Sequence, residues 1–276
     1  MDMLDQQYTQ LFTNALSSDK QIREAAEKTL SDLASADPTK FLLNLSFELA
    51  DEAKQTPGRQ MAAAVMKNFI TISDKTKEIW INLDINAKDQ IKNSILSTLA
   101  SKEKNVRKAA GMVIAGICKV DLPLTEKWPN LVSSLCSNSY NEDLNIRHAA
   151  IESLGYLCEE LTIKTIDALS IDSILSALIR NITDKEINPE ILFTALNAFL
   201  HCLPLAEKNF SKQNELIIIM NALFDVCSIN MNNDSILEKI SQIFIDVCVI
   251  YYDYIADYIA KFAEFTFWIV IYFPLN

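Results

Sequence analysis

The chain has 276 residues, of which 50% are apolar and 22% are charged, so it can bury a sizeable core and a disordered chain is excluded. The formal net charge of −11 argues against a general grip on nucleic-acid phosphates, which needs clustered lysine and arginine. An acidic surface of this kind suits a basic partner, or it serves solubility alone.

Rare residue types exclude several kinds of site. The four glycines are too few for a nucleotide-binding glycine loop, and the two histidines form no metal-binding motif, so we expect neither a cofactor nor a metal. The six cysteines are scattered in apolar stretches without a C-x-x-C pair, which indicates reduced thiols.

The first sixteen residues are too polar for a signal peptide, and the longest apolar run, 265–275, is shorter than the roughly 20 residues of a membrane span. We therefore expect a protein of the cytosol or nucleus.

Apolar residues recur at helical spacing along almost the whole chain, and no segment shows a convincing strand pattern. Prolines stand at the seams between these segments or in first turns, where their fixed φ is tolerated. In chain order, we expect helices at about 3–16, 20–35, 39–53, 58–72, 86–100, 104–119, 125–137, 143–160, 171–182, 189–203, 211–228, 235–251 and 254–271.

A short pattern recurs in these helices: a polar residue, a β-branched residue, arginine, any residue and two alanines. Its arginines are Arg23, Arg107 and Arg147, and Arg59 stands in a looser copy. The successive intervals of 36, 48 and 40 residues fit HEAT or armadillo repeats. Paired alanines on the second helix of each pair let neighbouring helices approach closely. The pattern predicts an all-α fold, a right-handed α-α superhelix (solenoid) of about six to seven HEAT repeats.

An acidic residue precedes three of these arginines by four positions. The pairs are Asp19 and Arg23, Glu103 and Arg107, and Asp143 and Arg147. At this spacing the two side chains can pair within a helix, the acid can cap the helix, and in a stack the residues can link adjacent repeats. The alternative is a set of surface ion pairs worth roughly 0.3–0.5 kcal/mol each. Because the pattern recurs in phase, we expect a structural ladder.

Several longer stretches keep a common order and spacing over about residues 1–260. They are AAAVMKN at 62–68, Trp80 followed by NAKDQIKN at 86–93, AGI at 115–117 with LP at 122–123, WPNL at 128–131, IESLGYLC at 151–158, NA at 197–198, NF at 209–210 and YYDY at 251–254. In these stretches the chain resembles the N-terminal part of the importin-beta (karyopherin) family.

The resemblance implies a nuclear transport receptor fragment rather than an enzyme. Residues 1–160 would form HEAT repeats 1–4 and bind Ran in its GTP form, and 161–260 would form repeats 5–6 and the start of 7 and bind FG nucleoporins. Importin alpha or cargo would bind only a full-length form. The resemblance further implies a protein found in the cytoplasm, in the nucleus and at pore complexes of the nuclear envelope. We expect a monomer and, from the charge and the short apolar run, no nucleic-acid or membrane partner.

The resemblance also implies particular contact residues. For FG repeats it gives Leu175, Ser176, Ile179, Glu215, Ile218 and Ile219, with Tyr258 in a second pocket. We expect Ile179 as the floor, Leu175 and Ile218 as walls, and an acceptor for the backbone N–H of the repeat. The alternative is that these aliphatic residues are plain core. For Ran it gives Lys67, Asn68, Arg107 and Glu152, although a single lysine is often just solvated.

Two features leave alternatives open. A HEAT scaffold or adaptor outside transport would share the arginine repeats but lack the Trp128-Pro129 and Tyr251-Tyr252 stretches. Residues 261–276 form an aberrant or truncated apolar tail, because an apolar helix at the end of a solenoid has no neighbour to cover it. We favour an artificial end there over a membrane-surface anchor.

Overall fold

The computed structural model describes residues 3–122 and 124–272, and this part of the chain consists of helices and turns without a strand. It divides into two compact units, Met1–Ile166 and Asp167–Asn276. Each unit is a stack of antiparallel helix pairs.

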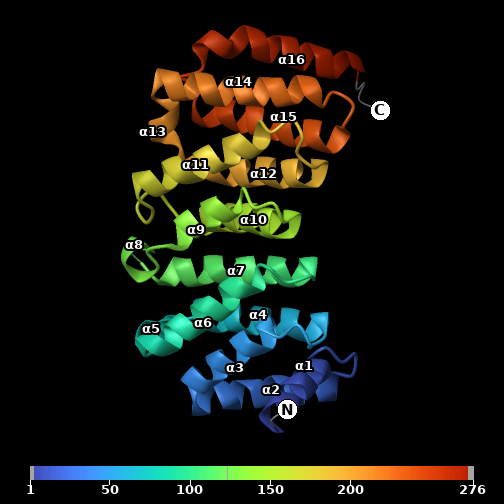
Figure 1. Ribbon diagram of the computed structural model, residues 1–276, viewed down its shortest axis with the longest axis vertical. Coiled ribbons are helices and arrows are strands. Elements are labelled where there is room, and N and C mark those ends of the chain that lie inside the picture. The colour runs from blue at the N-terminus through green and yellow to red at the C-terminus, as the bar shows by residue number, and fades with distance from the viewer. Residues whose placement is uncertain (1–2, 123, 273–276) are drawn as a thin grey trace. The chain divides into compact units, whose positions relative to one another are not determined.

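The first unit contains four helix pairs: α1 with α2, α3 with α4, α6 with α7 and α9 with α10. The second helices α4, α7 and α10 contact one another in that order (Figure 1). Its helices are α1 (Met3–Ala15), α2 (Lys20–Ala36), α3 (Pro38–Ala50), α4 (Thr56–Thr71), α5 (Asp74–Ile81), α6 (Ile85–Thr98), α7 (Lys104–Val120), α8 (Leu124–Lys127), α9 (Leu131–Asn138) and α10 (Leu144–Glu160).

Polar caps and prolines determine where many of these helices begin. Asp19 and Asp143 accept hydrogen bonds from first-turn N–H groups of α2 and α10, so two of the predicted acids are N-caps. Glu103 stands at the same place before α7 without such a bond. Pro38 opens α3, where its missing N–H costs nothing.

Two of the repeated arginines, Arg23 and Arg107, bind the turn of their own helix pair. Arg107 is 5% exposed, and its Nη1 donates to the carbonyl oxygens of Ser101 and Lys102 at 2.8 and 3.0 Å. Arg23 donates in the same way to the carbonyl of Ser17 at 3.0 Å. These two guanidinium groups therefore stabilise turn carbonyls in place of pairing with the acid four residues before.

One carboxylate connects the turns of adjacent repeats. Arg59 donates to the carbonyl of Leu49 at 2.8 Å and to Glu52 Oε1 at 2.6 Å. Glu52 also accepts hydrogen bonds from the Ser101 side chain and the Lys102 backbone, and these bonds, with that of Arg59 first, lower its pKa. Arg59, Glu52 and the turn bound by Arg107 thus form a continuous polar connection, and a ladder through the first four repeats stays a prediction.

The structure corrects two helix assignments in this unit. Helix α5 was not predicted; it is anchored by the buried Trp80, whose Nε1 donates to Asp121 at 2.9 Å. The single helix predicted at 125–137 is two helices, α8 and α9, separated at Trp128 and Pro129. Proline disfavours helical geometry at the residue before it and cannot donate within a helix.

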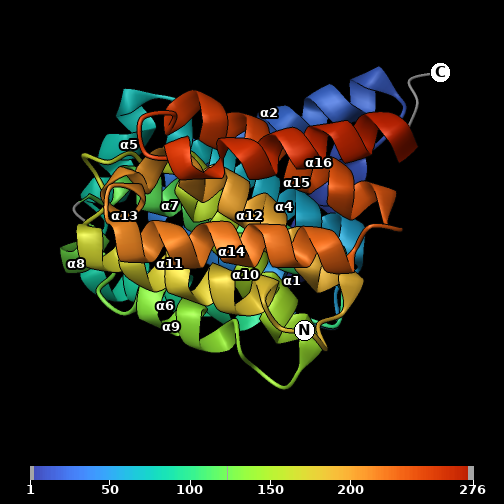
Figure 2. The same cartoon turned by 90° about the horizontal axis from the view of Figure 1, so that it is seen from above.

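The second unit pairs α11 (Ala168–Ile182) with α12 (Pro189–Cys202) and α14 (Gln213–Ile229) with α15 (Asp234–Ile250). Helix α11 also contacts α14, and α12 contacts α15 (Figures 1 and 2). The short α13 (Glu207–Phe210) was not predicted; it is fixed by Phe210, which is buried and stacks on Tyr251 at 4.0 Å between ring centroids. Two 3-10 turns, Leu203–Leu205 and Ala256–Tyr258, complete the connections.

The apolar tail forms α16 (Ile259–Tyr272), and aromatic residues cover one side of it. Phe262 and Phe265 pack edge-on against Phe244 of α15 at 5.2 and 5.0 Å, while Phe267 is 69% exposed. Residues 273–276 of the predicted tail lie outside the described residues. Within the described residues, no helix combines the length and apolarity needed to cross a bilayer.

Candidate functional site

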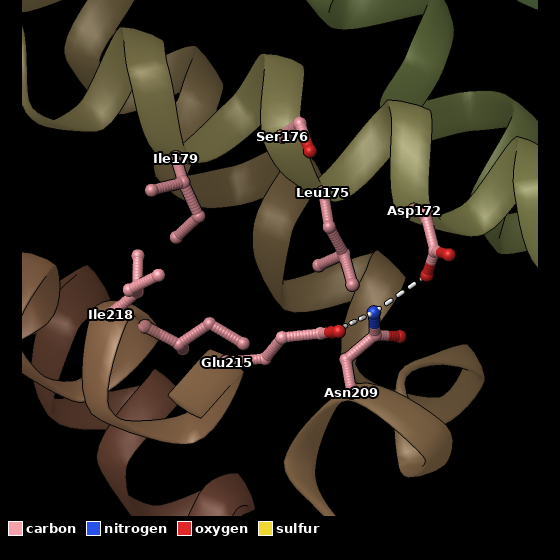
Figure 3. Close-up of a pocket in the computed structure, with 8 residues that line it drawn as sticks. Asp172, Leu175, Ser176, Ile179, Asn209, Glu215 and Ile218 are labelled. Carbon is pink, nitrogen blue, oxygen red and sulfur yellow. Dashed lines mark hydrogen bonds between the residues drawn. The ribbon is translucent and has the colours of Figure 1, made fainter. Parts of the chain in front are cut away.

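A pocket of about 310 Å³ lies between α11 and α14, closed at one end by α13 (Figure 3). Its lining includes all six residues of the pocket predicted from the sequence, together with Asp172 and Asn209. Helical spacing explains why these residues line one pocket. Asp172, Ser176 and Ile179 lie three or four residues apart on one side of α11. Glu215 and Ile218 lie three residues apart on the facing side of α14.

The apolar part of the pocket differs in detail from the prediction. Leu175 and Ile219, each 4% exposed, are the deepest apolar residues, so they form the floor in place of Ile179. Ile179 is half-buried, and Ile218 is 59% exposed at the rim. Figure 3 shows Ile179 and Ile218 facing one another from their two helices.

The opposite end of the pocket is polar and acidic. Asn209 is buried, and its Nδ2 donates to Asp172 Oδ1 at 2.7 Å and to Glu215 Oε2 at 2.6 Å. Lys212 donates to the other oxygen of Glu215 at 2.8 Å, and this bond is the main cause that lowers the pKa of Glu215. Among the described residues that line the pocket, two are carboxylates and none is a cation.

Sequence reasoning missed Asp172 and Asn209 as pocket residues. A signal for Asn209 was present, because the Asn209-Phe210 stretch was among those that carried the family resemblance. Its role depends on α13, which is a single turn and has no amphipathic period to reveal it. Asp172 is one turn before Ser176, so the spacing that joined Leu175 to Ile179 also covers it.

Tyr258 does not line this pocket. It is 7% exposed in the turn before α16, and its ring stacks on Phe224 at 6.3 Å between centroids. Lys261 Nζ stands 5.7 Å from the same ring. Tyr258 thus belongs to the aromatic cluster under α16, and its part in a second FG pocket stays a prediction.

The residues predicted to contact Ran lie on the second helices α4, α7 and α10. Lys67 is half-buried and pairs with Glu160 at 3.6 Å, and Lys119 pairs with the same carboxylate at 2.7 Å. Partial burial raises the pKa of Glu160, but the bonds and charges of Lys119 and Lys67 outweigh it and lower the pKa overall. One carboxylate therefore connects all three helices.

The other predicted Ran residues are more varied. Asn68 is exposed, and Glu152 is half-buried and accepts a hydrogen bond from Tyr156 Oη at 3.0 Å. Arg107 is buried with its guanidinium against turn carbonyls, so its geometry fits a structural role better than a contact role. Among the described residues, no group of histidine, cysteine and carboxylate side chains is arranged to bind a metal.

Comparison with known proteins identifies the family. Residues 26–101 match the Importin-beta N-terminal domain, and residues 102–265 match the IPO5-like, TPR repeats family. Importin subunit beta-1 of Arabidopsis thaliana is 30% identical over 264 residues, covering 94% of this chain and 30% of the relative. Importin subunit beta-1 of Saccharomyces cerevisiae is 30% identical over 268 residues, covering 92% of this chain and 30% of the relative.

Solved structures agree with this assignment. The Kap95:Nup1 complex matches with a TM-score of 0.84 and 26% identity, covering 95% of this chain and 31% of that one. Kap95p in a structure with RanGDP matches with a TM-score of 0.82 and 25% identity, covering 95% and 30%. The chain thus spans about 30% of the length of the relatives that it matches. These structures confirm the predicted all-α solenoid class, while the number of repeats stays a prediction. The chain belongs to the importin-beta family.

Proposed function

We propose that this chain is the part of a nuclear transport receptor that binds FG nucleoporins through the α11–α14 pocket and Ran-GTP through α4, α7 and α10. The observation that carries the proposal is the pocket itself, in which the six predicted residues meet around one apolar depression in a chain of the importin-beta family. Two related structures support it, since Kap95 was solved in complex with Nup1 and, in another structure, with RanGDP.

The pocket suits a phenylalanine side chain of an extended peptide. Leu175 and Ile219 offer an apolar floor, and burying the ring would gain roughly 1.5–3 kcal/mol. Asp172 and Glu215 supply acceptors for the N–H groups of the peptide backbone at the polar end. Ordering a disordered repeat offsets part of this gain, so a single site binds weakly, and several such sites together still give useful avidity.

For Ran, we propose a surface that includes Lys67, Asn68 and Glu152 and leaves out Arg107. Lys67 and Asn68 are accessible on α4, whereas Arg107 is needed inside its own repeat. A preference for Ran-GTP requires contacts that differ between the two nucleotide states, because equal affinity shifts no equilibrium. In the related structure, Kap95p binding induces the switch loops of RanGDP to adopt the GTP-bound conformation, which supports contact with those loops.

We propose that the protein is found in the cytoplasm, in the nucleus and at pore complexes, where its partners meet. It acts by binding, not by chemical catalysis, and as a monomer. Binding of importin alpha or cargo is proposed only for a full-length receptor, because this chain corresponds to about 30% of its relatives.

The test of the FG site is Ile179→Asp. An unpaired carboxylate in the apolar part of the pocket is costly to desolvate, so the variant should lose binding of an FxFG peptide in a calorimetric titration. The matched control is Ile245→Asp on α15, since Ile245 is 56% exposed and does not line this pocket. Retained peptide binding by Ile179→Asp would contradict the assignment. A joint loss of peptide and Ran-GTP binding would indicate that the substitution unfolds the chain as a whole.

A further inference from the structure

A second pocket lies in the same groove, beyond the first. It has a volume of about 220 Å³ and lies between the C-terminal parts of α11 and α14 and the start of α12. Ile182, Leu192, Ala222 and Val226 are nearly fully buried in its lining, and Ile229 is 65% exposed at its rim. Its interior is therefore apolar, like the floor of the first pocket.

The loop from α11 to α12 forms one wall of this second pocket, and hydrogen bonds within the loop stabilise it. The Ile187 N–H donates to the Asp184 carbonyl at 3.2 Å, and the Glu186 N–H donates to the Asp184 carboxylate at 3.1 Å. Thr183 Oγ1 donates back to the Ile179 carbonyl at 2.9 Å. These hydrogen bonds hold the loop in one conformation, so this wall of the second pocket is a defined feature of the fold.

The two pockets follow one another along one groove. On α11 the first pocket ends at Ile179 and the second begins at Ile182, and on α14 the first ends at Ile219 and the second begins at Ala222. Residue numbers increase in the same direction on both helices, so α11 and α14 run parallel there. With a rise of 1.5 Å per residue, the centres of the pockets lie roughly 12 Å apart.

An extended peptide covers this distance in about three to four residues. We propose that the second pocket is a subsite for another aromatic or large aliphatic side chain of the same peptide, placed three or four residues from the phenylalanine in the first pocket. The inference rests on the proposed function, because it needs a peptide in the first pocket. It is argued from the continuity of the two pockets and from their shared apolar lining.

The charges at the groove favour particular flanking residues of the peptide. Asp172 and Glu215 line the first pocket, and the lining of the second includes Asp184, Asp225 and Lys185. Asp225 is exposed. A peptide with a neutral or basic spacer between its two apolar residues therefore fits the groove better than one with an acidic spacer.

Peptides of fixed length that differ only in the position of the second phenylalanine provide the test. A peptide with one phenylalanine is compared with peptides that carry another at each position up to about six residues away. Once the first phenylalanine is bound, the second phenylalanine reaches the second pocket from the same peptide, so its binding is effectively intramolecular. The affinity should therefore rise about tenfold at a separation of three or four residues and fall again beyond it. Isothermal titration of the whole chain measures each dissociation constant.

Ile229→Glu then separates the two sites. Ile229 lines only the second pocket and is exposed, so its replacement should abolish the tenfold gain and leave the affinity for the single-phenylalanine peptide unchanged. The matched control Val249→Glu, at a 72% exposed position of α15 outside both pockets, should change neither affinity. Absence of a gain at every separation, or a gain that survives Ile229→Glu, would overturn the second subsite while leaving the proposed function intact. Failure of the wild type to bind any of the peptides would overturn both.

Discussion

Arg107 illustrates how a single side chain secures a helix pair. Its guanidinium reaches from the first turn of α7 to two carbonyl groups of the turn before that helix. Those carbonyls follow the end of α6, where backbone acceptors lack helical partners. A buried, charged donor satisfies both at once, which explains why the same residue type recurs at this position of the repeat.

Replacing Arg107 with alanine should destabilise the first unit. Two carbonyl groups lose a charged donor at a buried position, and the expected cost is about 2 kcal/mol. In a thermal melt followed by circular dichroism, we expect the midpoint to fall by about 4–8 °C and the transition to broaden. Lys108→Ala, at the exposed neighbouring position, is the control. An unchanged melt for Arg107→Ala would show that its hydrogen bonds to the turn add nothing to stability.

Glu160 should make the stability of the first unit depend on acid pH. Lys119 and Lys67 lower its folded-state pKa below the ordinary value of 4.5, so its contribution is complete above that pH and is lost as the pH falls through the lowered pKa. Glu160→Gln should therefore cost about 1 kcal/mol at neutral pH and nothing at the acid end. Urea denaturation of both proteins across this pH range measures the difference. A constant difference at all pH values would exclude the ion pairs as its cause.

At the scale of elements, glycine determines how closely the second helices pack. A Cβ atom at Gly111 of α7 would stand 2.7 Å from Ser153 Oγ of α10 and 3.3 Å from the ring of Tyr156. Ser153 cannot easily move, because it is buried and donates to the Ala149 carbonyl at 2.7 Å. The contact of α7 with α10 therefore depends on the absence of a side chain at this position.

Gly111→Ala should lower the melting temperature although alanine is the better helix former. The overlap with Ser153 should outweigh a gain in helix propensity of up to about 1 kcal/mol. Gly58→Ala in α4 is the matched control, since the nearest atom to its added Cβ would be Glu48 Oε1 at 3.8 Å. We expect that control to be neutral or stabilising. A higher melting temperature for Gly111→Ala would show that α7 and α10 separate at little cost.

The sequence predicted long elements better than short ones, for a physical reason. Helices such as α7 and α10 bury a periodic apolar face, and that period is visible in the residues. Helix α5 depends on the long-range contact of Trp80 with Asp121, and α13 depends on those of Phe210 with Tyr251 and of Asn209 with Asp172. No local pattern encodes such contacts, so these helices were missed.

The same limit applied to the candidate site. The spacing of Leu175 and Ile179 predicted a shared helix face, and the family resemblance supplied the facing residues of α14. The depth of each residue could not be predicted, because it depends on the position of α14 beside α11, and Ile219 proved deeper than Ile218. The bridge from Asn209 to two carboxylates required α13, which the sequence did not reveal.

At the scale of the whole molecule, the two proposed binding activities belong to different units. The proposed Ran surface lies in the first unit, and both pockets lie in the second. Because stability in a helical repeat protein is approximately a sum of terms between neighbours, a surface substitution in one unit should leave binding by the other unchanged. The net charge of −11 belongs to this scale too and suits partners with basic surfaces.

Titration of the chain with Ran in its two nucleotide states tests the central claim most directly. Weak peptide binding can occur in many apolar grooves, whereas a preference for one nucleotide state requires a specific transport-receptor surface. By calorimetry, we predict tighter binding of Ran-GTP than of Ran-GDP, and weaker Ran-GTP binding for Lys67→Glu. Glu160→Gln is the control, since it removes the partner of Lys67 without reversing the charge of Lys67 itself. Equal isotherms for the two nucleotide states, or no binding of either, would contradict the account.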